Sequence, residues 1–322
     1  MVSTLDVVMK EQSEYYFKRL DPSLYNDLIY ISKSAFGFDP GRNYYKQKNE
    51  TAVFGPPFLG YIAYSESHEP AAFYGVYACQ VEFNNQIYVA AQSGDTMTHK
   101  SHTGKGLFTK LARMTYELAK QEGISFIFGF PNKNSYPGFV KKLEWVCPAC
   151  LREYRQKVFT IPLAKLAKKI KVLAPLYRIY TTLVFKIFGL VDNGFENSSA
   201  GSGVITLKRT KDFILYKSFS GNTLVNVNSF KMWVKADGFL YLGDIEKKAQ
   251  INFEKINTGI RRLAFWLGCD VILFHVSPGA FWDNEFKKHL DSTDSLYYGY
   301  LNLDGKLPLE KLAFVMADSD TF

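Results

Sequence analysis

The segment Thr103-Gly104-Lys105-Gly106-Leu107-Phe108 decides the fold, because it joins a strand-like run to a helical pattern. Backbone N–H groups of such a loop point into one concavity, and the helix N-terminus adds about half a positive charge. The segment therefore predicts a phosphate site. A surface turn and a nucleotide site are the other interpretations. Neither nucleotide motif fits, because residue 109 is Thr and the Gly-Lys pair is not followed by Ser or Thr.

The residues around this loop predict a β-loop-α-β unit. Apolar residues recur at helical spacing from Gly106 to Gln121, and Gly123 follows as a helix stop. The Asn84-Asn85 pair indicates a hairpin turn, since Asn tolerates positive φ. Strands are expected at Phe58 to Tyr64, Ala71 to Phe83, Gln86 to Ala91 and Ser125 to Phe130.

The loop resembles the pyrophosphate loop of the GNAT superfamily, [RQ]-x-x-G-x-[GA], in which Gly104, Lys105 and Gly106 match. The run Phe128-Gly129-Phe130-Pro131-Asn132-Lys133-Asn134-Ser135 resembles the "GFPN…S" signature of some members. The two motifs in this order are more specific than either alone. The resemblance extends from about Val53 to about Trp145.

The resemblance implies an α/β fold: a mostly antiparallel mixed sheet, splayed where acetyl-CoA or another acyl-CoA binds. It also implies transfer of the acyl group to a small primary amine, with helices bordering the acceptor site at Glu14 to Phe36, where Tyr16, Leu20 and Leu24 have helical spacing. The cofactor-binding residues that it implies are Met97, Thr98 and His99 through their backbone, the loop residues Thr103, Gly104, Lys105, Gly106, Leu107 and Phe108, and Asn132.

Three departures from the family pattern concern binding and catalysis. Thr103 replaces the usual Arg or Gln, Phe108 replaces a Gly or Ala, and Val140 stands where a general-acid Tyr often lies. Acyl transfer needs a deprotonated amine and a protonated leaving thiolate. Tyr136 is the candidate proton donor to sulfur and Asp95 the candidate base, each with a packing or surface role as the alternative. His99 is a weaker candidate for a titrating group.

The second half repeats the order of the first. Strands are expected at Phe239 to Ile245, Asp270 to Val276 and Tyr297 to Leu303, and helices at Phe253 to Leu267 and Phe281 to Leu290. The equivalent junction, Glu246 to Gln250, carries side chains where a phosphate cradle needs bare backbone. We therefore expect a GNAT domain at 1–162, a helical connector and linker at 163–203, and a degenerate GNAT-like domain without its own cofactor at 204–322.

Positive charge is concentrated in one segment. Between Leu151 and Leu190 there are nine basic residues and one acidic residue, which equals the formal charge of +8 for the whole chain. No nucleic-acid-binding motif accompanies it, so a nucleic-acid partner is not expected. The apolar residues of 163–190 predict burial between domains, with a membrane-surface helix and a membrane span as alternatives. Asn193 to Gly203 is expected to be a linker.

The cysteines predict a cytoplasmic protein with reduced thiols. The first sixteen residues lack the features of a secretion signal. The Cys147-Pro148-Ala149-Cys150 pair has no matching ligands for zinc, so we expect a structural role and no metal, with a redox pair as the alternative. Besides an N-acyltransferase for a small amine, such as an amino sugar or its nucleotide conjugate, two functions stay open: a non-catalytic acyl-CoA-binding module and a peripheral membrane acyltransferase acting on a cell-envelope precursor.

Overall fold

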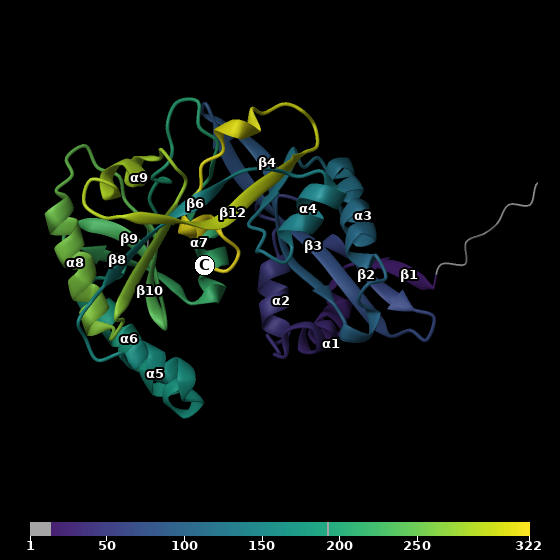
Figure 1. Cartoon of the computed structure of the whole chain (residues 1–322), viewed down its shortest axis with the longest axis horizontal. Coiled ribbons are helices and arrows are strands. Elements are labelled where there is room, and N and C mark those ends of the chain that lie inside the picture. The colour runs from purple at the N-terminus through teal and green to yellow at the C-terminus, as the bar shows by residue number, and fades with distance from the viewer. Residues whose placement is uncertain (1–13, 192) are drawn as a thin grey trace, which may run out of the picture.

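The computed structural model describes residues 14–191 and 193–322, which form two halves side by side around one continuous sheet (Figure 1). The prediction about a secretion signal falls mainly on residues 1–13, outside the described residues. The strands are β1 (Tyr15–Arg19), β2 (Leu59–Ser65), β3 (Pro70–Phe83), β4 (Gln86–Thr98), β5 (Phe126–Gly129), β6 (Val146–Lys157), β7 (Thr206–Leu207), β8 (Asn222–Val227), β9 (Phe230–Asp237), β10 (Phe239–Ile245), β11 (Val271–Val276) and β12 (Ser292–Asn302).

The helices cover this sheet and extend from it. The α-helices are α1 (Tyr25–Phe36), α2 (Arg42–Asn49), α3 (Leu107–Gln121), α4 (Tyr136–Leu143), α5 (Leu163–Lys169), α6 (Ala174–Phe188), α7 (Lys211–Lys217), α8 (Phe253–Trp266) and α9 (Phe281–Phe286). Short 3₁₀ helices are η1 (Pro22–Leu24), η2 (Lys100–His102), η3 (Lys171–Leu173), η4 (Ser218–Ser220), η5 (Leu309–Lys311) and η6 (Met316–Asp318).

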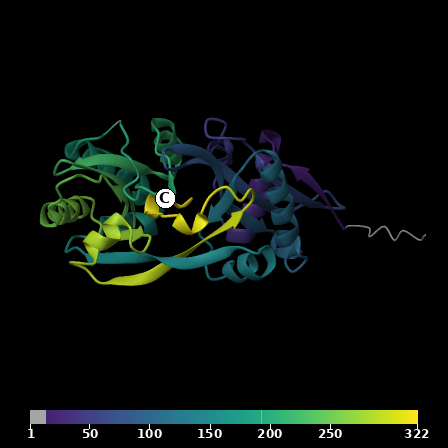
Figure 2. The same ribbon diagram turned by 90° about the horizontal axis from the view of Figure 1, so that it is seen from above.

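The two halves exchange their last strands. Within the described residues, the sheet order is β1-β2-β3-β4-β5-β12-β6-β11-β10-β9-β8, and β7 pairs with β3. Strand β12 of the second half therefore lies between β5 and β6, and β6 of the first half lies between β12 and β11, all antiparallel. Figure 2 shows β6 and β12 running together along the molecule. The halves consequently share one sheet, which a cut between 162 and 204 would divide.

Most of the predicted elements are confirmed. The hairpin turn has Asn84 and Asn85 at φ +49° and +62°, and the helix after the glycine loop ends before Gly123 at φ +82°. Helix α3 buries Leu107, Leu111 and the residues one turn further on against β2, β3 and β4, because its apolar stripe has helical spacing. These contacts fix the glycine loop at one end of the first half.

The helical prediction for Glu14 to Phe36 is wrong in its first part. Tyr15–Arg19 forms strand β1 and pairs antiparallel with β2. Aromatic residues favour β-strands, and the otherwise open edge of β2 gives hydrogen-bond partners to the backbone N–H and C=O groups of Tyr15–Arg19. Asp21 then caps η1, and the helix begins at Tyr25. The spacing of Tyr16, Leu20 and Leu24 was therefore no helical stripe.

Burial of the 163–190 segment between domains is also wrong. Helices α5 and α6 pack only one face on the second half, against β9 and β8, and most of their apolar side chains are exposed. Figure 1 shows both helices at the margin of the molecule. Within 14–191 and 193–322, no helix has both the length and the apolar character to cross a membrane.

The 193–203 segment is not a free linker, because Asn197, Ser198 and Ser199 are buried. The Ser198 backbone N–H donates to Asp244 at 3.1 Å, which ties the segment to β10. The Cys147-Cys150 pair lies in β6 as free thiols, and burial raises the pKa of Cys147 to about 11. A raised thiol pKa disfavours the reactive thiolate, which argues against a redox pair.

Candidate active site

A cavity opens where the pairing between β4 and β5 ends. The two strands are parallel and are paired at Ala91–Ile127 and Gln92–Phe128. Beyond this point lies a cavity of about 610 Å³, a volume suited to a small-molecule site. Its lining comes from β4, the start of α3, the β5–α4 connection and the end of the second half: Phe36, Ser93, Gly94, Asp95, Thr96, Phe108, Gly129, Phe130, Pro131, Asn132, Asn134, Ser135, Gly138, Phe139, Trp145, Asp320 and Thr321.

A bulge in β4 brings the predicted residue Asp95 to this cavity. The register of β4 against β3 shifts at this point, and Asp95 has φ +46°. Asp is one of the few residues that adopt the left-handed region without a large steric cost. Bulges of this kind redirect side chains next to functional sites. Here the extra residue gives the cavity wall a carboxylate.

Asp95 belongs to a charged cluster centred on Lys48 of α2. The Lys48 Nζ donates to Asp95 Oδ1 at 2.9 Å and to Asp320 Oδ2 at 3.2 Å. The Tyr77 hydroxyl donates to Asp95 Oδ2 at 2.5 Å. Among the described residues that line the cavity, the charged ones are the carboxylates Asp95 and Asp320, and a lining of this kind favours a cationic ligand.

The Lys48 ammonium is a fixed cation. Burial lowers its pKa, but the attraction of Asp95 and Asp320 outweighs burial and raises the pKa well above its ordinary value. The ammonium also lies over the rings of Tyr44 and Tyr77, at 5.3 and 4.8 Å from their centroids. Lys48 therefore holds the two carboxylates in place and does not act as a base.

The second carboxylate of the cluster comes from residues 318–322, far from β4 in sequence. Gln92 Nε2 of β4 donates to the Asp318 carbonyl at 2.8 Å, and Asn222 Nδ2 of β8 donates to the Phe322 carbonyl at 2.8 Å. These bonds fix the segment to both halves. The second half thus contributes to the lining of the cavity in the first half.

The glycine loop has the geometry of a phosphate cradle. Gly104 and Gly106 have φ of +78° and +73°, and a Cβ at either position would meet no atom within 4 Å. Gly106 is also the N-cap of α3, so the N–H groups of the first turn lie next to the loop. Open space beside bare backbone at a helix N-terminus fits the pyrophosphate of an acyl-CoA.

Phe108 does not crowd this cradle. Its ring packs edge-on against Phe139 at 5.4 Å and tilts toward Tyr74 at 6.0 Å, and it lines the cavity. Gly138 makes this packing feasible, because a Cβ there would lie 2.9 Å from the Phe108 ring. Leu107, the first residue of α3, is buried. Thr103 and Lys105 are exposed, and the Lys105 ammonium lies 3.5 Å from the Glu14 carboxylate. The replacement at 108 is accommodated by the core.

The predicted residues at the end of β4 have packing and hydrogen-bonding roles in this structure. The Met97 side chain is buried and its sulfur accepts from the Tyr45 hydroxyl at 3.5 Å. Thr98 pairs with Ala72 of β3. His99 Nδ1 accepts from the Ser101 backbone N–H at 3.3 Å. None of these three residues is among the described residues that line the cavity.

Asn132 lines the cavity from the β5–α4 connection, and Tyr136 begins α4 just after it. Asn132 Oδ1 accepts from the backbone N–H groups of Asn134 and Ser135, at 2.9 and 3.0 Å, and shapes the turn before α4. The Tyr136 ring packs on Tyr297 with centroids 4.5 Å apart, and it is not among the described residues that line the cavity. The structure thus brings Asp95 and Asn132 together at the cavity, and leaves Tyr136 beside it.

One cluster has the residue types of a metal site. Among the described residues, ligand atoms of Glu69, His99 and His102 lie within 4.8 Å of one another. Tyr15 bonds His102 Nδ1 at 2.9 Å, Tyr30 donates to Glu69 at 2.7 Å, and His102 Nε2 lies 3.5 Å from a Glu69 carboxylate oxygen.

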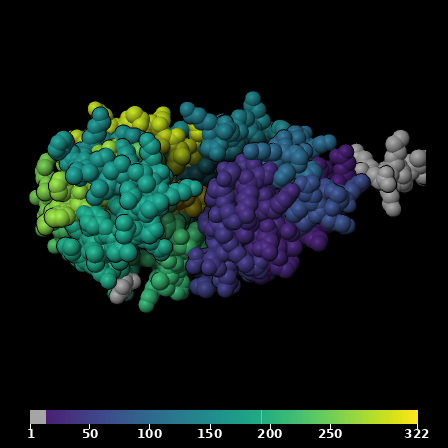
Figure 3. Space-filling model, turned by 90° about the horizontal axis from the view of Figure 1, so that it is seen from below, coloured from purple at the N-terminus to yellow at the C-terminus, as the bar shows by residue number. Residues whose placement is uncertain are grey.

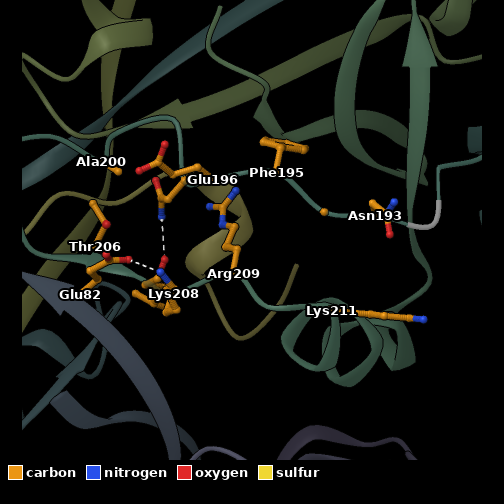
Figure 4. A pocket seen from close by; sticks show the side chains of 12 residues that line it. Glu82, Asn193, Phe195, Glu196, Ala200, Thr206, Lys208, Arg209 and Lys211 are labelled. Carbon is orange, nitrogen blue, oxygen red and sulfur yellow. Dashed lines mark hydrogen bonds and ion pairs between the residues drawn. The ribbon is translucent and has the colours of Figure 1, made fainter. Parts of the chain in front are cut away.

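A second cavity of about 450 Å³ lies along residues 193–211 (Figure 4). Three of its charged residues are paired: Lys208 donates to Glu82 at 2.5 Å, and the buried Arg209 bridges Asp244 and Asp318. These pairs join β3, β10 and η6. They therefore have a structural role in holding the two halves together.

The comparisons with known proteins agree with this geometry. Residues 17–147, less than half of the chain, match the family described as "Acetyltransferase (GNAT) domain". This region is a GNAT acetyltransferase domain. It contains the β4 bulge, the glycine loop and the β5–α4 connection. No curated protein matches the sequence.

Several solved structures resemble the whole chain, including the second half. A probable N-acyltransferase from Enterococcus faecalis has a TM-score of 0.59 at 14% identity, covering 93% of this chain and 75% of its own. A GCN5-related N-acetyltransferase from Kribbella flavida has a TM-score of 0.55 at 12% identity, covering 90% of this chain and 71% of its own. A putative acetyltransferase from Pyrococcus horikoshii has a TM-score of 0.51 at 16% identity, covering 91% of this chain and 92% of its own. At these identities the likeness shows the fold, which therefore extends beyond the GNAT domain.

Proposed function

We propose that the protein transfers an acetyl or other short acyl group from acyl-CoA directly to a small primary amine. One observation carries this proposal: in the GNAT domain, a single cavity adjoins a bare glycine cradle through Phe108 and is bordered by the carboxylates of Asp95 and Asp320. The cradle fits a pyrophosphate, and the carboxylates fit an ammonium group. An acyl donor and an amine acceptor would therefore meet in the cavity.

The residues of the two walls have distinct roles in this proposal. Bound acyl-CoA supplies an activated thioester. Residues 103–108 hold its pyrophosphate, while the backbone of Met97, Thr98 and His99 and the side chain of Asn132 border the rest of the cofactor. Asp95 takes the proton from the attacking amine, directly or through water. As the C–N bond forms and the C–S bond breaks, a proton returns to sulfur, and Tyr136 is the candidate donor.

The acceptor is inferred from the charge of the cavity. Amines are protonated near neutral pH, and the carboxylates of Asp95 and Asp320 in the cavity lining attract them. Amino sugars, their nucleotide conjugates and polyamines belong to this class. The basic residues of α5 and α6 do not line the cavity within the described chain. We therefore assign no anion-binding role in the acceptor site to that segment.

Replacing Asp320 by Asn is expected to raise KM for the amine about tenfold with little change in affinity for CoA, since a charge-assisted hydrogen bond contributes about 1.5–3 kcal/mol. Initial rates of CoA thiol release with a panel of amines measure this. Asp294→Asn, an exposed acid on β12, is the matched control and should keep the wild-type KM. An unchanged KM in Asp320→Asn would remove Asp320 from the acceptor site.

Replacing Thr103 by Arg is expected to tighten CoA binding by on the order of 1 kcal/mol, or about fivefold, because a guanidinium reaches a phosphate bidentately. Thr103 is exposed and its hydroxyl donates to the Lys100 carbonyl at 3.0 Å, so the larger side chain has room. Calorimetry at low and high salt measures the gain. Weaker binding, or a gain without salt dependence, would show that residue 103 faces away from the cofactor.

Two other functions make different predictions. A non-catalytic acyl-CoA-binding module would bind CoA but release no thiol with any amine. A peripheral membrane acyltransferase acting on a cell-envelope precursor is favoured by the exposed apolar residues of α5 and α6, and would prefer a lipid-linked amine to a free one. For both acyltransferase functions, we propose that the reaction takes place in the cytoplasm. We also propose that the second half supports the first and binds no cofactor of its own.

A further inference from the structure

The outer face of helix α6 is apolar and exposed. Four residues spaced three, four and four apart form one stripe along the helix. Their exposed fractions lie between 54% and 80%, whereas Val184 and Phe185 on the inner face are buried. A helix that packed with one face only would normally place polar side chains on the other. The stripe consists of Leu176, Ile179, Leu183 and Ile187.

The stripe continues onto neighbouring segments. Thr160 Oγ1 donates to the Phe265 carbonyl at 3.0 Å, and the Tyr180 hydroxyl of α6 donates to the Trp266 carbonyl, so both segments adjoin the end of α8. Exposed apolar residues gathered on adjoining segments mark an interaction surface. We call it the α6 face; it comprises Phe159 (99% exposed), Ile161, Val172 (82%), Leu176, Ile179, Leu183, Ile187, Phe265 and Trp266.

Positive charge surrounds the α6 face. Residues 157–190 contain seven Lys or Arg residues and no Asp or Glu. Two of them pair with acids of the second half, Lys165 with Asp270 and Lys168 with Asp237. Lys169, Lys171, Arg178 and Lys186 are exposed around the apolar residues. An apolar face bordered by lysine and arginine is the pattern of helices that lie in the surface of an anionic membrane.

We propose that the α6 face docks onto an anionic lipid bilayer, with α6 lying in the interface. Charge decides between this occupant and a second copy of the chain, because a two-fold interface would place the same positive patch against itself. Length decides how the helix lies: 15 residues rise roughly 22 Å, less than the ~30 Å of a hydrocarbon core. The apolar residues enter the headgroup boundary, and the basic residues contact lipid phosphates.

This docking would orient the proposed active site. In Figure 3, the α5–α6 segment and the α1–α2 helices lie on the same face of the molecule. Helix α1 ends at Phe36, which lines the cavity. A docked protein would thus hold α1 and α2 toward the membrane, where an amine attached to a lipid is presented. This consequence rests on the proposed acyl transfer, whereas membrane docking does not.

Vesicle co-sedimentation of the full chain tests the docking. Phosphatidylcholine vesicles containing phosphatidylglycerol should sediment the wild type, and pure phosphatidylcholine vesicles should not. The double variant Leu176→Asp with Ile179→Asp should partition at least about tenfold less, since it removes two exposed apolar side chains that would enter the bilayer and adds two anions. Lys169→Glu with Lys171→Glu should also lose about tenfold or more. Leu215→Asp, an equally exposed leucine on α7, is the matched control and should sediment like the wild type.

Three outcomes would overturn the proposal. The wild type could remain in the supernatant with anionic vesicles. The Leu176→Asp, Ile179→Asp variant could sediment as the wild type does, which would leave a charge contact without apolar docking. Light scattering could show a wild-type dimer that this variant converts to a monomer, without vesicle binding, so that a second copy covers the face. Acyl transfer to a soluble amine should stay unchanged in all these variants, which separates this test from that of the proposed function.

Discussion

The Gly106→Glu variant is expected to lose CoA binding by about a hundredfold or more, near 3 kcal/mol, while remaining folded. Gly106 has nothing within 4 Å of a Cβ position, so the new side chain enters the open space that the pyrophosphate would occupy. Its carboxylate repels the phosphates and competes for the N–H groups at the start of α3. Isothermal titration calorimetry with CoA measures the loss, and circular dichroism verifies the fold.

Gly123→Glu is the matched control, since it places the same residue at the other end of α3. Gly123 also has a positive φ and open space around its Cβ position, so both variants carry a similar backbone strain of about 1–2 kcal/mol. Comparable melting temperatures with CoA binding lost only in Gly106→Glu would confirm the loop. Equal CoA affinity in the two variants would contradict it.

The local elements could be predicted because their signals lie in short runs of sequence. The glycines at 104 and 106, the apolar stripe of α3 and the Asn84-Asn85 turn each specify a backbone conformation through nearby residues. Asp95 could be chosen because it lies on the strand that precedes the loop. Its bulge, however, depends on pairing with β3, and no run of residues in β4 announces a register shift.

The rest of the site depends on contacts between distant segments. Asp320 reaches the cavity because residues 318–322 are bonded to β4 and β8, and two acids in a short run carry no sign of that. Lys48 was likewise missed, since a lysine on a polar helix is normally exposed. For α6, apolar composition predicted burial, although composition does not say whether protein or another surface covers a helix.

Removing everything after Asn193 is expected to yield an insoluble chain. The truncation deletes β12 from between β5 and β6 and β11 from beside β6, leaving one edge of β5 and both edges of β6 unpaired. It also exposes the inner faces of Leu151 and Tyr154 that pack in the shared core. These losses exceed the roughly 5–15 kcal/mol of net stability that a folded domain has. Aggregation in expression trials measures the outcome, and a soluble, fully active 1–193 chain would contradict the role of the second half.

Cutting the chain between the two halves, without removing any residue, tests whether the exchanged strands hold the halves together or whether the covalent connection alone does. A protease site inserted between Gly201 and Ser202 lies in an exposed stretch, with open space around Gly201. After cleavage, the two fragments should stay together in native size-exclusion chromatography and still bind one CoA per complex, because β6 and β12 each remain paired within the other half's part of the sheet. Separation of the fragments, or two CoA molecules bound per complex, would show that the halves are independent units; association with one CoA makes the second half a structural part of a single site.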